Sequence, residues 1–251
     1  EVGKYFMRYS GESNLKRVSL ECGGKTPHII MPDAADLDKA AANAAGGIFF
    51  NQGEVCNAGS RLLVHESIKD EFLERVIHHS RRWTPGDPLD PATNMGAMVD
   101  ARQHERVLSY IDKGKAEGAS LRLGGAAART DTGGYYIEPT LFDGVDSSMT
   151  IAREEIFGPV LSTLTFRTTE EAFKIANDTI YGLASAIWTR DISTAMKAAR
   201  TIKAGSVWIN CFDAGDITTP FGGFKQSGWG RENGREGVEA YTEVKSIAIA
   251  L

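Results

Sequence analysis

The 251-residue sequence has few cysteines, no long apolar run and no excess of positive charge. Its three cysteines, Cys22, Cys56 and Cys211, are too few and too scattered for a disulfide framework or a zinc site. This scarcity favours a reducing compartment, and we expect a cytoplasmic protein. No apolar stretch approaches the roughly 20 residues of a membrane-spanning helix, so we expect no membrane partner. The first residues also lack the apolar core of a signal peptide.

The charge balance is mildly acidic, with a net charge of -5 and a pI near 5.6. This balance argues against nucleic acid as a partner. The five histidines show no ligand spacing, so we expect no metal site. Two nucleotide-binding motifs fail as well. "GGKT" (23–26) has serine at position 19 where a P-loop needs glycine, and "GWGREN" (228–233) ends in Asn233 with no strand before it.

Short apolar strands alternate with amphipathic helices along most of the chain. This alternation predicts an α/β fold with a mostly parallel, wound sheet. The tail 241–251 is strand-like but has no helix returning to it, so it pairs either with its own sheet or with another subunit. We expect strands at 18–24, 28–31, 61–66, 121–125, 135–145, 160–166, 184–189 and 205–210, and helices at 36–50, 67–83, 103–117, 169–177 and 192–202.

Two segments place a reactive side chain among glycines. "FNQGEVCNAG" (50–59) surrounds Cys56 with glycines and amides, and "LECGGK" (20–25) puts Glu21 where a strand gives way to a glycine turn. Glycine lets a backbone approach a ligand closely. A nucleophilic thiolate needs such access, and a carboxylate within reach of the same carbon can activate water. The residues alone leave two interpretations open: a nucleophile with its base, or a buried loop thiol and a surface acid.

Six motifs in order resemble the aldehyde dehydrogenase superfamily: "LECGGK", "FFNQGEVCNAGSR", "EEIFGPV", "YGLASAIWT", "AGSVWIN" and "PFGGFKQSGWGRE". The similarity runs over essentially the whole chain and resembles the C-terminal half of such an enzyme. It implies a remnant of the dinucleotide-binding domain (1–23), a catalytic domain (24–226), a return segment to the cofactor side (227–240) and an oligomerisation strand (241–251). The expected assembly is a homodimer or homotetramer.

The resemblance also implies a mechanism. Cys56 matches the nucleophile, whose thiolate attacks an aldehyde to give a thiohemiacetal and then a thioester. The Cys56 backbone N–H and an asparagine of the other half would hold the oxyanion. Glu21 matches the general base that activates water to release the acid, and Glu232 matches a second acid that relays protons. On this interpretation, alkylation of Cys56 should be faster than that of Cys22 and Cys211, and saturating aldehyde should protect it.

The implied cofactor is NAD or NADP. Glu155 matches the glutamate that binds the nicotinamide ribose, and Phe157 the aromatic ring that contacts the cofactor. Cys22 and Gly23 match the backbone at the nicotinamide amide. The expected cofactor-binding residues are Glu155, Phe157, Cys22, Gly23, Gln103, Arg106 and Val2, with Gln103 and Arg106 reaching ribose and Val2 near the adenine.

The expected substrate is an aldehyde, and acidic residues near the tunnel favour a cation at its far end. The sequence is most similar here to aminoaldehyde and γ-glutamyl-aminoaldehyde dehydrogenases. As a separate polypeptide we expect the chain to be inactive. Two alternatives are a CoA-acylating relative, disfavoured by Glu21, and a non-catalytic module that assembles through its tail. The expected substrate-binding residues are Glu54, Val55, Phe212, Asp213, Asp216 and Phe221.

Overall fold

The computed structural model describes residues 1–251, and its centre is a sheet of seven strands in the order β10-β9-β2-β3-β8-β7-β4. All neighbours pair in parallel except β4, which is antiparallel to β7. The predicted mostly parallel α/β sheet is confirmed. The strands are β1 (Leu20–Glu21), β2 (Pro27–Ile30), β3 (Arg61–His65), β4 (Ser120–Leu123), β5 (Ala127–Ala128), β6 (Tyr136–Ile137), β7 (Thr140–Asp143), β8 (Val160–Phe166), β9 (Ala184–Trp188), β10 (Ser206–Ile209) and β11 (Gly228–Trp229).

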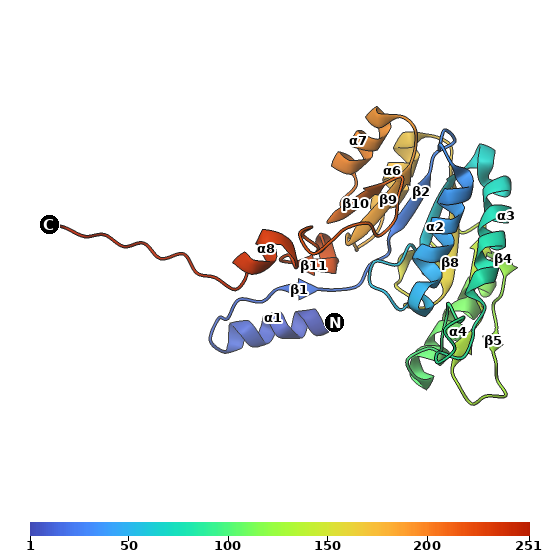
Figure 1. Cartoon of the computed structure of the whole chain (residues 1–251), viewed down its shortest axis with the longest axis horizontal. Coiled ribbons are helices and arrows are strands. Elements are labelled where there is room, and N and C mark those ends of the chain that lie inside the picture. The colour runs from blue at the N-terminus through green and yellow to red at the C-terminus, as the bar shows by residue number, and fades with distance from the viewer.

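Helices cover both faces of this sheet, as Figure 1 shows. Ile29 and Leu63 point to one face, where they pack with α4, α5, α6 and α7. The next residues on the same strands, Ile30 and Val64, point to the other face and pack with α2 and α3. The α-helices are α1 (Val2–Glu12), α2 (Leu37–Phe49), α3 (Lys69–Ser80), α4 (Ala101–Ala116), α5 (Thr150–Arg153), α6 (Thr169–Asn177), α7 (Ile192–Thr201) and α8 (Gly234–Glu239).

Capping side chains mark the starts of α2, α4, α6 and α7. Asp36 accepts a hydrogen bond from the Lys39 N–H at 2.9 Å and caps α2, and Thr168 caps α6 through the Glu171 N–H. The expected helix from 67 to 83 is divided, because 3₁₀ turns at Glu66–Ile68 and Arg81–Trp83 flank α3. The sequence patterns missed α5, α8 and β11, which are too short to carry a periodic signal.

A second, smaller unit lies beside the sheet. Strand β1 pairs with β11, which places Glu21 opposite Gly228, and α1 precedes this ribbon. The long strand expected at 18–24 is therefore reduced to two residues at the point where the chain enters the sheet.

The expected strand at 241–251 does not form in the single chain. This tail is exposed, pairs with no other segment, and extends past α8 away from the body (Figure 1). The alternative in which it adds to its own sheet is therefore wrong. Its apolar residues stay exposed, with Val244 at 99% and Ile247 at 80%, because a lone strand finds no backbone partner here. None of the helices has the length and apolar character needed to cross a membrane.

Candidate active site

The residues that carry chemistry lie at the amino ends of three neighbouring strands. Glu21 to Gly24 precede β2, Cys56 precedes β3, and Glu155 to Phe157 precede β8. Ligands of open α/β sheets usually bind beyond the carboxyl ends of the strands. Here three loops meet at the opposite edge: a Cβ on Gly24 would come within 2.5 Å of the Cys56 carbonyl oxygen. Glycine is needed there for the loops to touch.

Cys56 and Glu21 lie close enough together for each side chain to shift the pKa of the other. Burial raises the pKa of the Cys56 thiol to about 12, and the Glu21 carboxylate adds to this effect. Burial also raises the pKa of Glu21, the hydrogen bond from Cys56 opposes that rise, and the negative charge of Glu232 adds to it. The thiol is therefore held protonated next to a carboxylate that can accept its proton.

The loop before Cys56 is fixed by unusual backbone. Asn51 and Gln52 adopt left-handed φ values of 48° and 56°, and Gly53 has φ 72°. The Asn51 Nδ2 donates to the Glu54 carbonyl at 3.0 Å and closes a polar turn. A Cβ on Gly53 would overlap the Gly158 carbonyl of the loop before β8, so this glycine brings two active-site loops together.

Glu155 lies directly over the Gly23–Gly24 backbone. Its Oε1 accepts from the Gly24 N–H at 3.1 Å, and a Cβ on Gly23 would overlap its Oε2. Burial raises the pKa of Glu155, which the Gly24 N–H and Lys25 oppose. The carboxylate is therefore held near Cys56, whose thiol pKa it also raises.

Phe157 has the left-handed φ of 59°, rare for a bulky side chain, and is 38% exposed. Gln103 and Arg106 of α4 hold this strained loop. The Gln103 Nε2 donates to the Ile156 and Phe157 carbonyls at 3.0 and 2.6 Å, and Arg106 donates to the Glu155 carbonyl at 2.9 Å. Both side chains bind the loop that carries Glu155 and Phe157, which is a different role from the expected contact with ribose.

Glu232 pairs through its backbone with Phe221 in an isolated antiparallel bridge, with N···O distances of 2.7 and 2.8 Å. This bridge brings the charge of Glu232 close enough to Glu21 to raise its pKa. Cys22 and Gly23 are held by Ser227, whose carbonyl accepts from the Cys22 N–H at 3.0 Å and whose hydroxyl donates to the Gly23 carbonyl at 2.7 Å.

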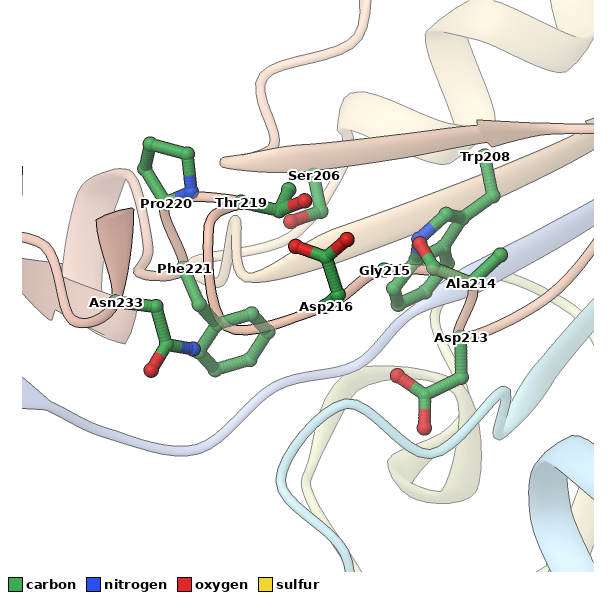
Figure 2. Close-up of a pocket in the computed structure, with 10 residues that line it drawn as sticks. All are labelled: Ser206, Trp208, Asp213, Ala214, Gly215, Asp216, Thr219, Pro220, Phe221 and Asn233. Carbon is green, nitrogen blue, oxygen red and sulfur yellow. The ribbon is translucent and has the colours of Figure 1, made fainter. Parts of the chain in front are cut away.

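The loop between β10 and β11 forms the wall of a pocket of about 320 Å³. Figure 2 shows Asp216 directed between Trp208 and Phe221, with Asp213 at one end. The Asp216 Oδ1 accepts from the Thr218 N–H at 2.8 Å and from its hydroxyl at 2.5 Å, which lowers the pKa of Asp216. This pocket therefore combines two aromatic rings with a carboxylate that remains ionised at neutral pH.

A second pocket of about 460 Å³ lies on the other side of Asp213, between α2 and the Cys56 loop. Val55 and Phe212 line it, and the Phe212 ring stacks on His28 at 5.0 Å. Gly59 leaves room for that ring, since a Cβ there would lie 3.1 Å from Phe212. Glu54 belongs to neither pocket. Its Oε1 accepts from the Val99 N–H at 3.2 Å, and burial raises its pKa.

The sequence analysis did not identify two residues near the site, Phe50 and Lys25. Phe50 is 61% exposed and lines the second pocket together with Val55, which had been expected to bind substrate. Lys25 is 1% exposed, and its Nζ has no hydrogen-bond partner. Burial, with Arg61 adding, lowers the pKa of Lys25 to about 7, against the opposing charges of Glu155 and Glu154. A lysine placed between two glycines and a buried strand is the sequence signal that could have identified Lys25. The sequence analysis interpreted it only as part of a possible P-loop.

Val2, which was expected near the adenine, lies outside this cluster. It is 62% exposed at the start of α1. No group of three or more histidine, cysteine or acidic side chains is arranged to hold a metal ion.

The fold and the site together define a wound α/β domain with a thiol–carboxylate pair and a second carboxylate on a glycine turn. Residues 1–247 match the model of the aldehyde dehydrogenase family, and the chain belongs to that family. The chain spans about half the length of the curated relatives it matches. Aldehyde dehydrogenase 1A1 of Gallus gallus is 49% identical over 251 residues, which are 100% of this chain and 49% of that protein.

Solved structures share the fold closely. An indole-3-acetaldehyde dehydrogenase in complex with NAD+ is 59% identical, with a TM-score of 0.98 over 100% of this chain and 50% of that one. A γ-glutamyl-γ-aminobutyraldehyde dehydrogenase of Burkholderia cenocepacia is 54% identical, with a TM-score of 0.95 over 97% of this chain and 49% of that one.

Proposed function

We propose that this chain is the catalytic and assembly part of an NAD(P)-dependent aldehyde dehydrogenase that converts an aldehyde to a carboxylic acid. The observation that carries the proposal is the proximity of the Cys56 thiol and the Glu21 carboxylate at the meeting point of three loops. Family membership and the NAD+ complex of a relative with 59% identity support it.

The residues present fit a nicotinamide nucleotide. The Glu155 carboxylate lies against Gly23, which has no Cβ to displace it. Phe157 exposes an aromatic ring beside it. A carboxylate accepts hydrogen bonds from ribose hydroxyls, and an aromatic ring packs against a planar heterocycle. Glu155 and Phe157 would hold the nicotinamide end, with the backbone of Cys22 and Gly23 beside it. When bound, the nicotinamide accepts a hydride from the substrate carbon.

The first step belongs to the Cys56–Glu21 pair. The Cys56 sulfur forms a bond to the aldehyde carbon, the C=O π electrons move to oxygen, and the thiol proton passes to Glu21. The Cys56 backbone N–H stabilises the oxyanion. Burial raises the pKa of Glu21, which favours its taking up the proton, but burial also raises the pKa of Cys56, so the proton leaves the sulfur only as the new bond to carbon forms.

Glu21 also serves the last step. Once the acyl group is a thioester on Cys56, Glu21 takes a proton from water as the oxygen attacks the acyl carbon. The C–S bond then breaks, the carboxylic acid leaves, and the sulfur takes back a proton. The charge of Glu232 raises the pKa of Glu21. We propose that protons exchange with solvent through Glu232.

The test of this activity uses the longest natural polypeptide that contains this chain. Aldehyde-dependent reduction of NAD+ or NADP+ should be abolished by Cys56→Ser and should fall by about 10²- to 10⁴-fold in Glu21→Gln, the usual contribution of a general base. Unchanged turnover in Cys56→Ser would refute the proposal. Acyl transfer to CoA that is faster than hydrolysis would instead support the CoA-acylating alternative.

For the substrate, we propose an aldehyde with a cationic far end, such as an aminoaldehyde. The pocket that holds Asp216 between Trp208 and Phe221 supports this class, because aromatic faces and a carboxylate both attract an ammonium group. The 54% identical γ-glutamyl-γ-aminobutyraldehyde dehydrogenase is consistent with it, although the 59% identical indole-3-acetaldehyde enzyme acts on an aldehyde without that cation.

Comparing kcat/KM for 4-aminobutyraldehyde and butyraldehyde tests the substrate class. Asp216→Asn should reduce the preference for the cation by about 1.5- to 5-fold, the range of an exposed ion pair. Asp191→Asn is the matched control, since Asp191 also accepts from a threonine hydroxyl but lies at the start of α7. A wild-type enzyme without this preference, or a preference that Asp216→Asn leaves unchanged, would refute the cationic substrate.

We further propose assembly through the apolar tail 241–251, which lacks a partner in the single chain. The three unpaired cysteines support a reducing compartment such as the cytoplasm. A non-catalytic assembly module would share the tail, but it would have no use for the Cys56–Glu21 pair.

A further inference from the structure

The residue after the thiol is bound across the site to the loop that lines both pockets. The Nδ2 of Asn57 donates to the Oδ1 of Asp213 at 2.8 Å. Asn57 is only 6% exposed, and Asp213 has a left-handed φ of 52°. Asn51 bonds within its own turn, to the Glu54 carbonyl. The Asn57 side chain instead reaches a residue 156 positions away in the sequence.

Asp213 occupies a central place between the two pockets. It lines the 320 Å³ pocket with Asp216 and the 460 Å³ pocket with Val55 and Asn57. Its loop is fixed on the other side, because the Trp208 Nε1 donates to the Ala214 carbonyl at 2.9 Å. The Asn57–Asp213 contact therefore joins the nucleophile's turn to a loop with its own anchor.

We propose that Asp213 and Asn57 are positioning residues whose hydrogen bond holds Cys56 against Glu21 and links the nucleophile to the substrate loop. The link to substrate rests on the proposed function, whereas the position of the thiol does not. Because the Asn57 amide is buried, loss of this acceptor would leave its N–H unpaired and out of water, so the bond favours one conformation of this short turn. Asp213 then acts mainly as an acceptor, and Asp216 is left as the carboxylate for a cation.

The proposal separates the hydrogen bond of Asp213 from its charge. Asp213→Asn keeps an acceptor oxygen and removes the charge, whereas Asp213→Ala removes both. Asn57→Leu keeps the volume and the charge of Asp213 but removes the donor. Asn177→Leu is the matched control, because Asn177 also joins distant segments, through the Thr201 carbonyl and the Lys203 N–H, away from Cys56.

The readout is the alkylation rate of Cys56 by iodoacetamide at pH 8, followed peptide by peptide so that Cys22 and Cys211 are counted separately. Asn57→Leu and Asp213→Ala should each raise the rate about tenfold, because a thiol released from Glu21 and from burial loses one pKa unit or more. The double variant should match either single one, since both remove the same bond. Asp213→Asn and Asn177→Leu should stay within about twofold of the wild type.

The results that would overturn the proposal are equally specific. Rates within twofold of the wild type for both Asn57→Leu and Asp213→Ala would show that the bond does not position the thiol. An Asp213→Asn rate equal to that of Asp213→Ala would assign the effect to charge. If a variant fails to fold by circular dichroism, Asn57→Ser provides a second test, because serine keeps a donor and should fall between the wild type and Asn57→Leu.

Turnover of the longest natural polypeptide distinguishes this proposal from the substrate class. Asp213→Ala should lower kcat for 4-aminobutyraldehyde and butyraldehyde alike, and Asp216→Asn should change kcat/KM for the cation alone. A positioning effect without any cation preference would refute the substrate class and leave the inference intact.

Discussion

Replacing Lys25 by methionine should stabilise the chain and remove one component of its pH dependence. Lys25 is 1% exposed and its Nζ has no hydrogen-bond partner. Arg61 is buried beside it with a guanidinium already bound to three carbonyls, including that of Lys25 itself at 2.9 Å. An ammonium group in this place loses its hydration and gains no direct ion pair, so burial lowers the pKa of Lys25 from 10.5 to about 7.

The size of the effect follows from linkage. A pKa that falls from 10.5 to about 7 on folding means that the unfolded chain binds more protons between these values. Stability therefore rises with pH in this window, and the penalty is greatest below pH 7. At 1.36 kcal/mol per pKa unit, the penalty is about 5 kcal/mol below pH 7, about 4 at pH 7 and close to zero above pH 10.5. Methionine has a similar length and no charge, so it avoids this penalty.

Urea unfolding at several pH values measures the difference between wild type and variant, which cancels the groups that both share. The advantage of Lys25→Met should decrease by about 2.5 kcal/mol between pH 7.5 and 9.5. Lys39→Met, on the exposed side of α2, is the control for the loss of a positive charge. An advantage that is constant with pH, or a destabilised Lys25→Met variant, would refute the account and indicate that the ammonium ion is stabilised by Glu155 and Glu154.

Three further substitutions test the site. Glu21→Gln should speed alkylation of Cys56 at pH 8 by several-fold, because the carboxylate contributes to the raised pKa of the thiol, and an unchanged rate would contradict the pair. Gly23→Ala should displace Glu155 and weaken NAD+ binding about tenfold or more. Calorimetry on the longest natural polypeptide measures this affinity, and an unchanged affinity would contradict the proposed cofactor turn. Gly53→Ala combines a left-handed φ with a backbone clash and should cost roughly 3 kcal/mol in urea unfolding, and a loss below 1 kcal/mol would argue against the loop packing.

The sheet was predictable because its patterns are local. Short apolar runs such as 62–64 are typical of strands buried on both faces, and capping residues such as Asp36 mark helix starts. Cys56 and Glu21 were also found, because glycines around a reactive side chain are a local signal. The family resemblance supplied their pairing, which no spacing in the sequence gives.

What the sequence did not reveal depends on contacts between distant segments. Gln103 and Arg106 hold the carbonyls of the Glu155–Phe157 loop, and a helix pattern cannot say which loop will lie beside it. The same is true of the bond between Asn57 and Asp213. The tail differs from these cases: its alternating pattern predicted a strand, and none forms in the single chain, which offers it no neighbouring strand.

The raised pKa of Cys56 predicts slow alkylation of the free thiol, whereas the family resemblance predicts that Cys56 is alkylated faster than Cys22 and Cys211. With a pKa of about 12, the thiolate fraction at pH 8 is about one in ten thousand, far below that of an ordinary cysteine. A thiol in this state resists alkylating and oxidising reagents, because both attack the thiolate. An aldehyde differs from such reagents if it binds with its carbonyl between the sulfur and the Cys56 N–H, since proton transfer to Glu21 then accompanies bond formation. We therefore propose that the carboxylate that suppresses the free thiolate also makes the sulfur reactive toward a bound aldehyde.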